Sequence, residues 1–217
     1  MMKTLSIILT FIISLSFSSC ARKMREAKYN AYELVGIEKR DLFKREVKNV
    51  KEEQEETGEA FKDALTRLKE MYNFEGGDLE KQHAKLKSSY EEAREEAGDL
   101  NGRIKNVNDV AGDLFAEWKK EIAEISASDL QKKSKTQLNQ TKERFKALQT
   151  QMAGAQKKID PVLTKLKDQV LFLKHNLNAK AIVGLKAESA DIETDIQSLI
   201  KEVEEASKEA DQFIKSL

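Results

Sequence analysis

Residues 192–217 read IETDIQSLIKEVEEASKEADQFIKSL, and mostly apolar side chains recur in this stretch at alternating steps of four and three residues. On an α-helix, such heptad spacing places these side chains along one line, which is buried only where other helices pack against it. We call this line the seam of the helix. Its members here are Ile192, Ile196, Leu199, Val203, Ala206, Ala210, Phe213 and Leu217. The pattern therefore predicts one helix of a coiled coil or helical bundle.

The same spacing organises most of the remaining chain. Four predicted seams run from Phe43 to Met71, from Leu79 to Trp118, from Leu130 to Leu177 and from Ile182 to Leu217. The third seam keeps its phase across Pro161, so we expect that helix to continue without a loop. The sequence thus predicts an all-α fold, an elongated antiparallel helical bundle or coiled coil of about four helices.

Short polar stretches separate the predicted helices. FEGGDL (residues 74–79) contains a glycine pair and then an aspartate, which predicts a turn followed by a helix N-cap. SASDLQ (residues 126–131) offers a capping box in which Ser128 pairs with Gln131. HNLNAK (residues 175–180) is the third predicted turn. Because short connections join antiparallel neighbours, we expect the helices to form a slender rod.

Charge is distributed unevenly among these helices. The whole chain is neutral, with 38 basic and 38 acidic residues, and only 6% of its residues are aromatic, which is typical of long helices. The segments 22–74, 78–125, 129–177 and 178–217 carry net charges of +1, −4, +7 and −4. We interpret the basic third helix as neutralised by acidic neighbours packed beside it. The alternative is a surface that binds phosphate groups.

The N-terminus predicts export from the cytoplasm. One lysine precedes the apolar run from Leu5 to Phe17, which is short for a membrane-spanning helix and typical of a signal peptide comprising residues 1–19. Ser18 and Ser19 precede Cys20 and resemble a bacterial lipobox, which predicts cleavage between Ser19 and Cys20 and attachment of a lipid to Cys20. The alternative is an ordinary signal peptide that leaves this lone cysteine unmodified.

The predicted mature chain begins at Cys20 with a lipidated tether, residues 20–28, followed by a single helical domain, residues 29–217. Ala21 follows the cysteine, where an aspartate would indicate retention at the inner membrane. By resemblance to Gram-negative lipoproteins, we expect the protein to lie on the periplasmic face of the outer membrane, in the cell envelope, with the lipid as its membrane contact.

The sequence offers no catalytic constellation. Glu80 and His83 have the spacing found in di-iron bundles, but no second such pair exists, so we interpret His83 as a seam residue. We expect glutamate pairs such as Glu55–Glu56 and Glu95–Glu96 to lie on solvent-exposed helix faces. We therefore expect no enzymatic activity, no metal site, no cofactor and no small-molecule substrate.

Two stretches are more apolar than a seam requires. VLFLKHNL (residues 170–177) places Leu171, Phe172 and His175 away from the seam, and LFAEW (residues 114–118) adds Phe115 and Trp118. Either further helices cover these side chains in a widened bundle, or a partner does. These five residues form our candidate interaction patch.

YNFEGGDLE from Tyr72, LFAEW from Leu114, DQVLFLKHNLNAKAI from Asp168 and VGIEKRDLF from Val35 resemble the DUF2959 family of bacterial envelope proteins of unknown function. The resemblance implies an exported helical protein and supplies no catalytic residue. We expect a structural or protein-interaction module that binds another envelope protein or itself. The alternative is a nucleic-acid or DNA-repair accessory protein that uses the basic third helix.

Overall fold

The computed structural model describes Tyr29 and residues 38–74, 76–187 and 189–217. The chain divides into two compact units, residues 1–42 and 43–217. In the first unit, the Lys39 ammonium lies 5.3 Å from the centre of the Tyr29 ring. No helix in the described ranges is both long enough and apolar enough to span a membrane.

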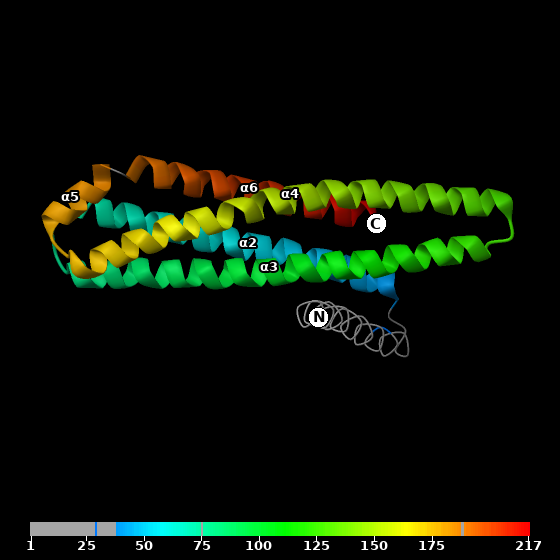
Figure 1. The fold of residues 1–217 in the computed structure, drawn as a ribbon, viewed down its shortest axis with the longest axis horizontal. Coiled ribbons are helices and arrows are strands. Elements are labelled where there is room, and N and C mark those ends of the chain that lie inside the picture. The colour runs from blue at the N-terminus through cyan, green and yellow to red at the C-terminus, as the bar shows by residue number, and fades with distance from the viewer. Residues whose placement is uncertain (1–28, 30–37, 75, 188) are drawn as a thin grey trace, which may run out of the picture. The chain divides into compact units, whose positions relative to one another are not determined.

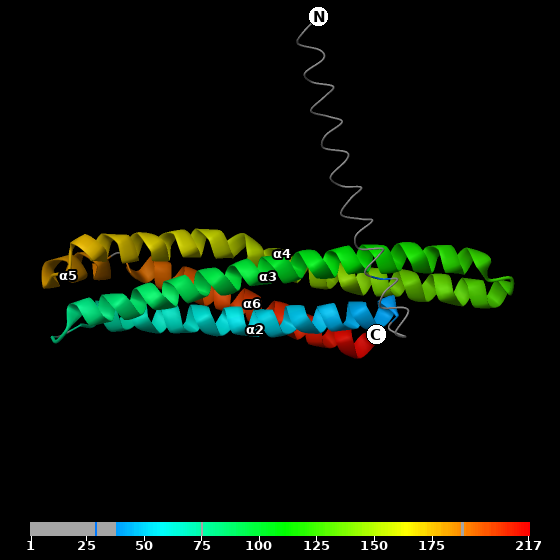
Figure 2. The same ribbon diagram turned by 90° about the horizontal axis from the view of Figure 1, so that it is seen from below.

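Five helices make up the described chain, and these residues contain no strand. The helices are α2 (Lys39–Tyr72), α3 (Leu79–Glu124), α4 (Ser128–His175), α5 (Ala179–Ala187) and α6 (Ser189–Ser216). Within residues 43–217, α2, α3, α4 and α6 run side by side, each antiparallel to the next long helix along the chain (Figures 1 and 2). The predicted all-α antiparallel bundle is thus confirmed.

The seams form the core of this bundle. All nine predicted seam residues of α2, including the polar Gln54 and Thr57, have no solvent exposure, and most seam residues of α3, α4 and α6 are also buried. Four phenylalanine rings, one from each long helix, form a layer across the bundle. They are Phe43, Phe115, Phe145 and Phe213, and the ring centroids of Phe43 lie 5.2–5.8 Å from those of the other three. We call these rings the aromatic layer.

Beyond the aromatic layer, α3 and α4 alone continue among residues 43–217, as a two-helix hairpin (Figure 1). The indole Nε1 of Trp118 donates to Ser134 Oγ at 2.9 Å and joins the two helices there. Leu130 is 58% exposed, so its predicted place in the buried third seam is wrong. Two helices cover only a narrow strip of each other, and this leaves the leucine near the turn uncovered.

The helix ends agree with two of the three predicted signals. Asp78 caps α3 by accepting a hydrogen bond from Lys81 N at 2.9 Å, after Gly76 and Gly77, whose φ angles of 151° and 114° suit glycine. α4 ends at His175, as the third turn predicted.

The predicted capping box between Ser128 and Gln131 is wrong. The N-cap position of α4 is Ala127, which has no side-chain oxygen, and Ser128 is already helical. The Gln131 amide instead donates to the carbonyl of Ile122 at 3.1 Å. It therefore adds a second hydrogen bond to a carbonyl at the end of α3, which already accepts one from Ile125 N, and does not satisfy a free N–H of its own helix.

α4 is continuous through Pro161, as its uninterrupted seam predicted. The last predicted helix is instead divided into α5 and α6. α5 leads from the end of α4 into α6 at one end of the bundle (Figure 1). Ile182 and Leu185 of α5 and Ile192 of α6 are buried, so the heptad pattern runs through both helices.

The basic helix α4 packs closely against α3 and α6, the two acidic helices, as the charge distribution predicted. Lys158 Nζ lies 2.7 Å from Glu202 Oε1, and Lys165 pairs with Asp195, both on α6. Gly154 supports this contact, because a Cβ there would lie 2.9 Å from a Glu202 oxygen. Part of the positive charge of α4 is therefore neutralised within the bundle.

Candidate functional site

The predicted cleavage and lipidation residues, Ser19 and Cys20, lie outside the described residues, as do the predicted signal peptide, residues 1–19, and the tether, residues 20–28. They remain sequence-based predictions.

The first part of the candidate interaction patch is exposed at one end of the bundle. On α4, Leu171 is 48% exposed, Phe172 is 44% exposed and His175 is also exposed. Leu173, between them, is fully buried in the seam. No helix of the bundle therefore covers Leu171 and Phe172, which we call the α4 end patch. Val183 of α5, 70% exposed, is another large apolar side chain at this end of the bundle (Figure 1).

The second part of the predicted patch lies far along the bundle. Phe115 is half-buried in the aromatic layer, where Lys142 Nζ lies 5.6 Å from its ring centre. Trp118 is half-buried in the two-helix hairpin. The structure therefore separates Phe115 and Trp118 from Leu171, Phe172 and His175. The former two pack mainly within the bundle, and the latter three face solvent.

His83 has a structural contact that explains its position. Its Nε2 atom lies 2.9 Å from the carbonyl oxygen of Val170, which joins α3 to α4. The ring is half-buried at its seam position, as the heptad pattern predicted.

A third region was not predicted from the sequence. Glu53 and Glu56 of α2 and Glu96 of α3 each place a carboxylate oxygen within 4.8 Å of the others. We call these residues the glutamate triad. The Glu53 side chain is only 7% exposed, and it forms an ion pair with Arg103 Nε at 3.4 Å. The other oxygen of Glu53, Oε1, is buried and has no hydrogen-bond donor in the part of the chain that the structure describes.

Crowding in the triad affects proton binding. The pKa of Glu96 is raised from 4.5 to about 7, first because burial disfavours its charged form and second because its carboxyl group hydrogen-bonds Glu53. The negative charges of Glu53, Glu56 and Asp99 raise it further. Glu96 therefore keeps its proton to a higher pH than an ordinary glutamate does.

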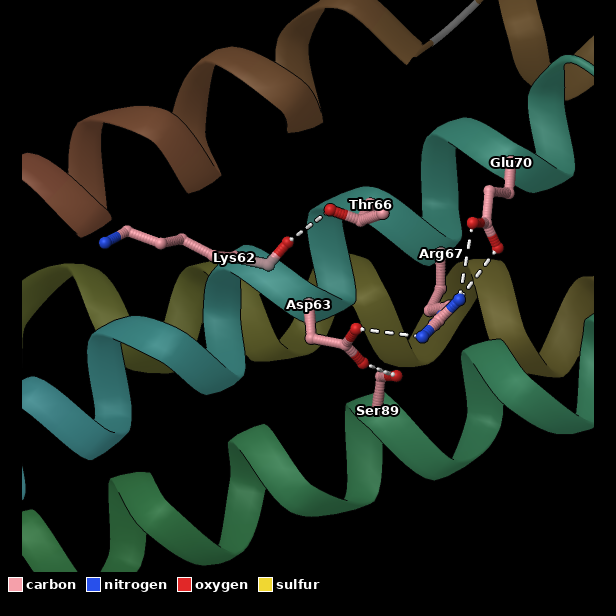
Figure 3. Close-up of polar contacts among 6 residues, drawn as sticks. All are labelled: Lys62, Asp63, Thr66, Arg67, Glu70 and Ser89. Atoms are coloured by element: carbon pink, nitrogen blue, oxygen red, sulfur yellow. Dashed lines mark hydrogen bonds and ion pairs between the residues drawn. The ribbon is translucent and has the colours of Figure 1, made fainter.

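The triad borders a depression of about 400 Å³ between α2 and α3, lined by Glu56, Glu59, Ala60, Asp63, Glu92 and Glu96. Two of these carboxylates have cationic partners. Glu59 lies 2.8 Å from Lys62 Nζ, and Asp63 lies 3.2 Å from Arg67. Figure 3 shows Asp63 bonded both to Arg67 on its own helix and to Ser89 on α3. Among the described residues, Glu56, Glu92 and Glu96 form no ion pair, so the unbalanced negative charge of the depression lies on these three carboxylates.

The sequence contained only a weak signal for the triad. Glu56 and Glu96 sit in doublets that read as solvated helix faces, and Glu56 is indeed exposed. Glu53 is buried because it borders the seam where that seam turns polar, at Gln54 and Thr57. Gln54 and Thr57 are successive polar positions in an otherwise apolar seam, and they were the only sequence feature that indicated polar packing between the helices here. The partner residue on α3 depends on the register of the two helices, which spacing alone does not specify.

The fold and these regions define an all-α protein built as an antiparallel bundle with a two-helix extension. A family model described as "protein of unknown function (DUF2959)" matches residues 28–217, and the chain belongs to this family. No protein with a curated function is similar enough to match the chain.

Proposed function

We propose that this DUF2959 protein is an envelope lipoprotein, held on the periplasmic face of the outer membrane by a lipid on Cys20, that acts by binding another envelope protein. In this proposal the protein is a structural or interaction module and catalyses no reaction. The apolar run and the lipobox-like residues before Cys20 support this proposed location.

The exposure of the α4 end patch is the observation that carries the interaction. Leu171 and Phe172 are neighbouring large apolar side chains that the bundle leaves uncovered. Adjacent exposed apolar residues are characteristic of protein contact sites. Lys167 and Lys174, both exposed, lie one helical turn either side of Leu171, and the exposed Asp168 lies one turn before it. The partner that fits is a protein with an apolar contact surface bordered by charged groups.

The basic charge of α4 also raised the alternative of nucleic-acid binding. Lys158 and Lys165 use part of that charge in ion pairs with α6. A protein partner is therefore the preferred proposal, because the apolar patch adds a feature that phosphate recognition does not require.

Site-specific photocrosslinking in intact cells tests the interaction. A photoreactive amino acid replaces Phe172 in one variant and Lys146, an exposed position elsewhere on α4, in the control. We expect position 172 to capture an envelope protein that position 146 does not capture, and Leu171→Ala to reduce that product. Equal capture at both positions, or capture of a second copy of the chain, contradicts the proposed partner.

Fatty-acid labelling tests the anchor separately. An alkyne fatty acid should label the wild-type protein, and Cys20→Ala should abolish the label and release the protein from membranes. A wild-type protein that takes up no label is not a lipoprotein, whatever the crosslinking shows.

A further inference from the structure

The antiparallel packing of α2 and α3 brings the glutamate triad together. Thr57 Oγ1 donates to the backbone carbonyl of Glu96 at 3.3 Å, and this bond joins the two helices beside the triad. Glu53 and Glu56 are three residues apart and therefore share one face of α2. Three carboxylates thus meet from two helices whose relative position is supported by a direct contact.

Glu53 supplies an observation independent of the acidic composition. Its side chain is 7% exposed, and when Glu96 is ionised, no donor among the described residues reaches the Oε1 atom of Glu53. Buried carboxylate oxygens are almost always hydrogen-bonded, because an unpaired one loses its hydration without compensation. A cation bound by the triad would accept electron pairs from these oxygens and would compensate for the lost hydration.

The charge balance specifies the kind of ligand. The three carboxylates carry three negative charges when ionised, and Arg103 supplies one positive charge through its contact with Glu53. Within the part of the chain that the structure describes, Glu56 and Glu96 form no ion pair of their own. The surplus is two negative charges, which one divalent cation would neutralise.

We propose that Glu53, Glu56 and Glu96 bind a hard divalent cation such as Ca²⁺ or Mg²⁺ between α2 and α3. Oxygen-only ligands select such ions over softer metals. Ca²⁺ lies about 2.3–2.6 Å from its oxygen ligands, so two ligands on opposite sides are about 5 Å apart. The triad oxygens, which lie within 4.8 Å of one another, fit one shared Ca²⁺, whereas Mg²⁺, at about 2.0–2.1 Å from its ligands, would require them to move closer together. The adjoining depression admits the water molecules that complete the coordination shell.

This site departs from the expectation drawn from the sequence, which predicted no metal. Its consequence is structural: a bound ion would join α2 to α3 near the middle of the bundle. The competing account is that Glu96 simply shares a proton with Glu53. The two accounts differ in whether divalent cations stabilise the fold.

Thermal unfolding of the purified full chain, first stripped with a chelator, tests the proposal. At constant ionic strength, CaCl₂ or MgCl₂ should raise the Tm in a saturable manner, by about 5 °C at about a hundred times the Kd. Glu56→Gln and Glu96→Gln should lose most of this rise. Glu95→Gln removes the same charge from the exposed neighbouring position on α3 and should keep it.

Titration calorimetry with the same ions, and paramagnetic resonance with Mn²⁺ as a probe, give readouts independent of stability. We expect one ion per chain and a Kd at least about tenfold weaker in Glu96→Gln. The proposal is wrong if NaCl of matched ionic strength reproduces the Tm rise, or if Glu96→Gln and wild type bind Mn²⁺ equally. It is also wrong if Glu96→Gln stabilises the stripped protein while neither ion changes the wild-type Tm.

Discussion

Phe172 and Leu173 are adjacent in α4 and have opposite surroundings. Phe172 is 44% exposed and Leu173 is fully buried. Phe172→Ala should therefore reduce the free energy of unfolding by less than about 1 kcal/mol, because solvent already surrounds much of the ring. Leu173→Ala should cost about 2–5 kcal/mol through lost burial and an unfilled cavity. Chemical denaturation of the two variants measures the difference, and a large loss in Phe172→Ala would place that ring in the core.

Glu96 makes the stability of the metal-free protein depend on pH. Its pKa in the folded state, about 7, lies above the ordinary 4.5, so the folded state binds the proton more tightly than the unfolded state does. The resulting stabilisation is complete below pH 4.5 and is lost as the pH rises through 7. We expect a loss of about 1–2 kcal/mol, less than the full pKa difference implies because solvent reaches part of the carboxylate.

Denaturation in a chelating buffer at pH 5.5, 7 and 8.5 measures this loss. Glu96→Gln should flatten the pH dependence and be more stable than wild type at the highest pH, because the amide never ionises. Glu95→Gln serves as the control and should retain the wild-type slope. Equal slopes in all three proteins would mean that Glu96 titrates normally.

Prediction from the sequence was least complete at the residue scale. Most apolar positions that share a heptad phase were placed correctly, since burial of one fixes its neighbours three and four residues away, and Leu130 near the hairpin turn is an exception. Leu171 and Phe172 were singled out because they fall off that phase, and the structure leaves both exposed. The glutamate triad was missed because its members come from two helices. Bringing Glu96 beside Glu53 requires the axial register of α2 against α3, and that register depends on side-chain packing rather than on spacing within either helix.

Each long helix depends on tertiary packing more than on its own propensity, because its charged outer face contributes little burial. Leu166 on α4 and Ile196 on α6 have no solvent exposure. Leu166→Asp or Ile196→Asp should therefore cost more than about 3 kcal/mol, since each places an unpaired charge in the core. Gln197→Asp introduces the same group at an exposed neighbouring position and should cost no more than about 0.5 kcal/mol. Unchanged melting of the seam variants would mean that the seams are not buried in solution.

Helix boundaries were predicted well where backbone chemistry dictates them and less well elsewhere. The glycine pair before Asp78 adopts positive φ angles that end one helix before α3 begins, so this turn could be predicted from the sequence. Ser128 and Gln131 matched a capping pattern, but Gln131 bonds the end of α3, which lies close by only after the hairpin has formed. α5 and α6 share one heptad phase, and periodicity alone therefore does not separate them.

At the scale of the bundle formed by residues 43–217, burial is less complete beyond the aromatic layer, where Leu138 and Ile122 are buried but Trp118 is half-buried. On one side, four helices bury Leu148, Met152 and Leu166 almost completely; on the other, α3 and α4 cover each other alone and leave Leu130 58% exposed. Segments with little buried apolar surface open at lower free energy than the global transition. The hairpin turn should therefore open independently of the four-helix part.

Hydrogen exchange measured by mass spectrometry checks this gradient. Backbone amides of residues 119–136 should exchange through local opening, at least about tenfold faster than those of residues 148–173, although α4 runs continuously from Ser128 to His175. Phe145→Ala removes one ring of the aromatic layer, whose centroid lies 5.2 Å from that of Phe43. The remaining rings lose this packing partner, so the fast-exchanging region should extend toward the four-helix part. Leu138→Ala lies in the hairpin and should accelerate exchange only there. Uniform protection along α4 in the wild-type protein would contradict the gradient and would mean that the hairpin is covered as well as the rest of the bundle.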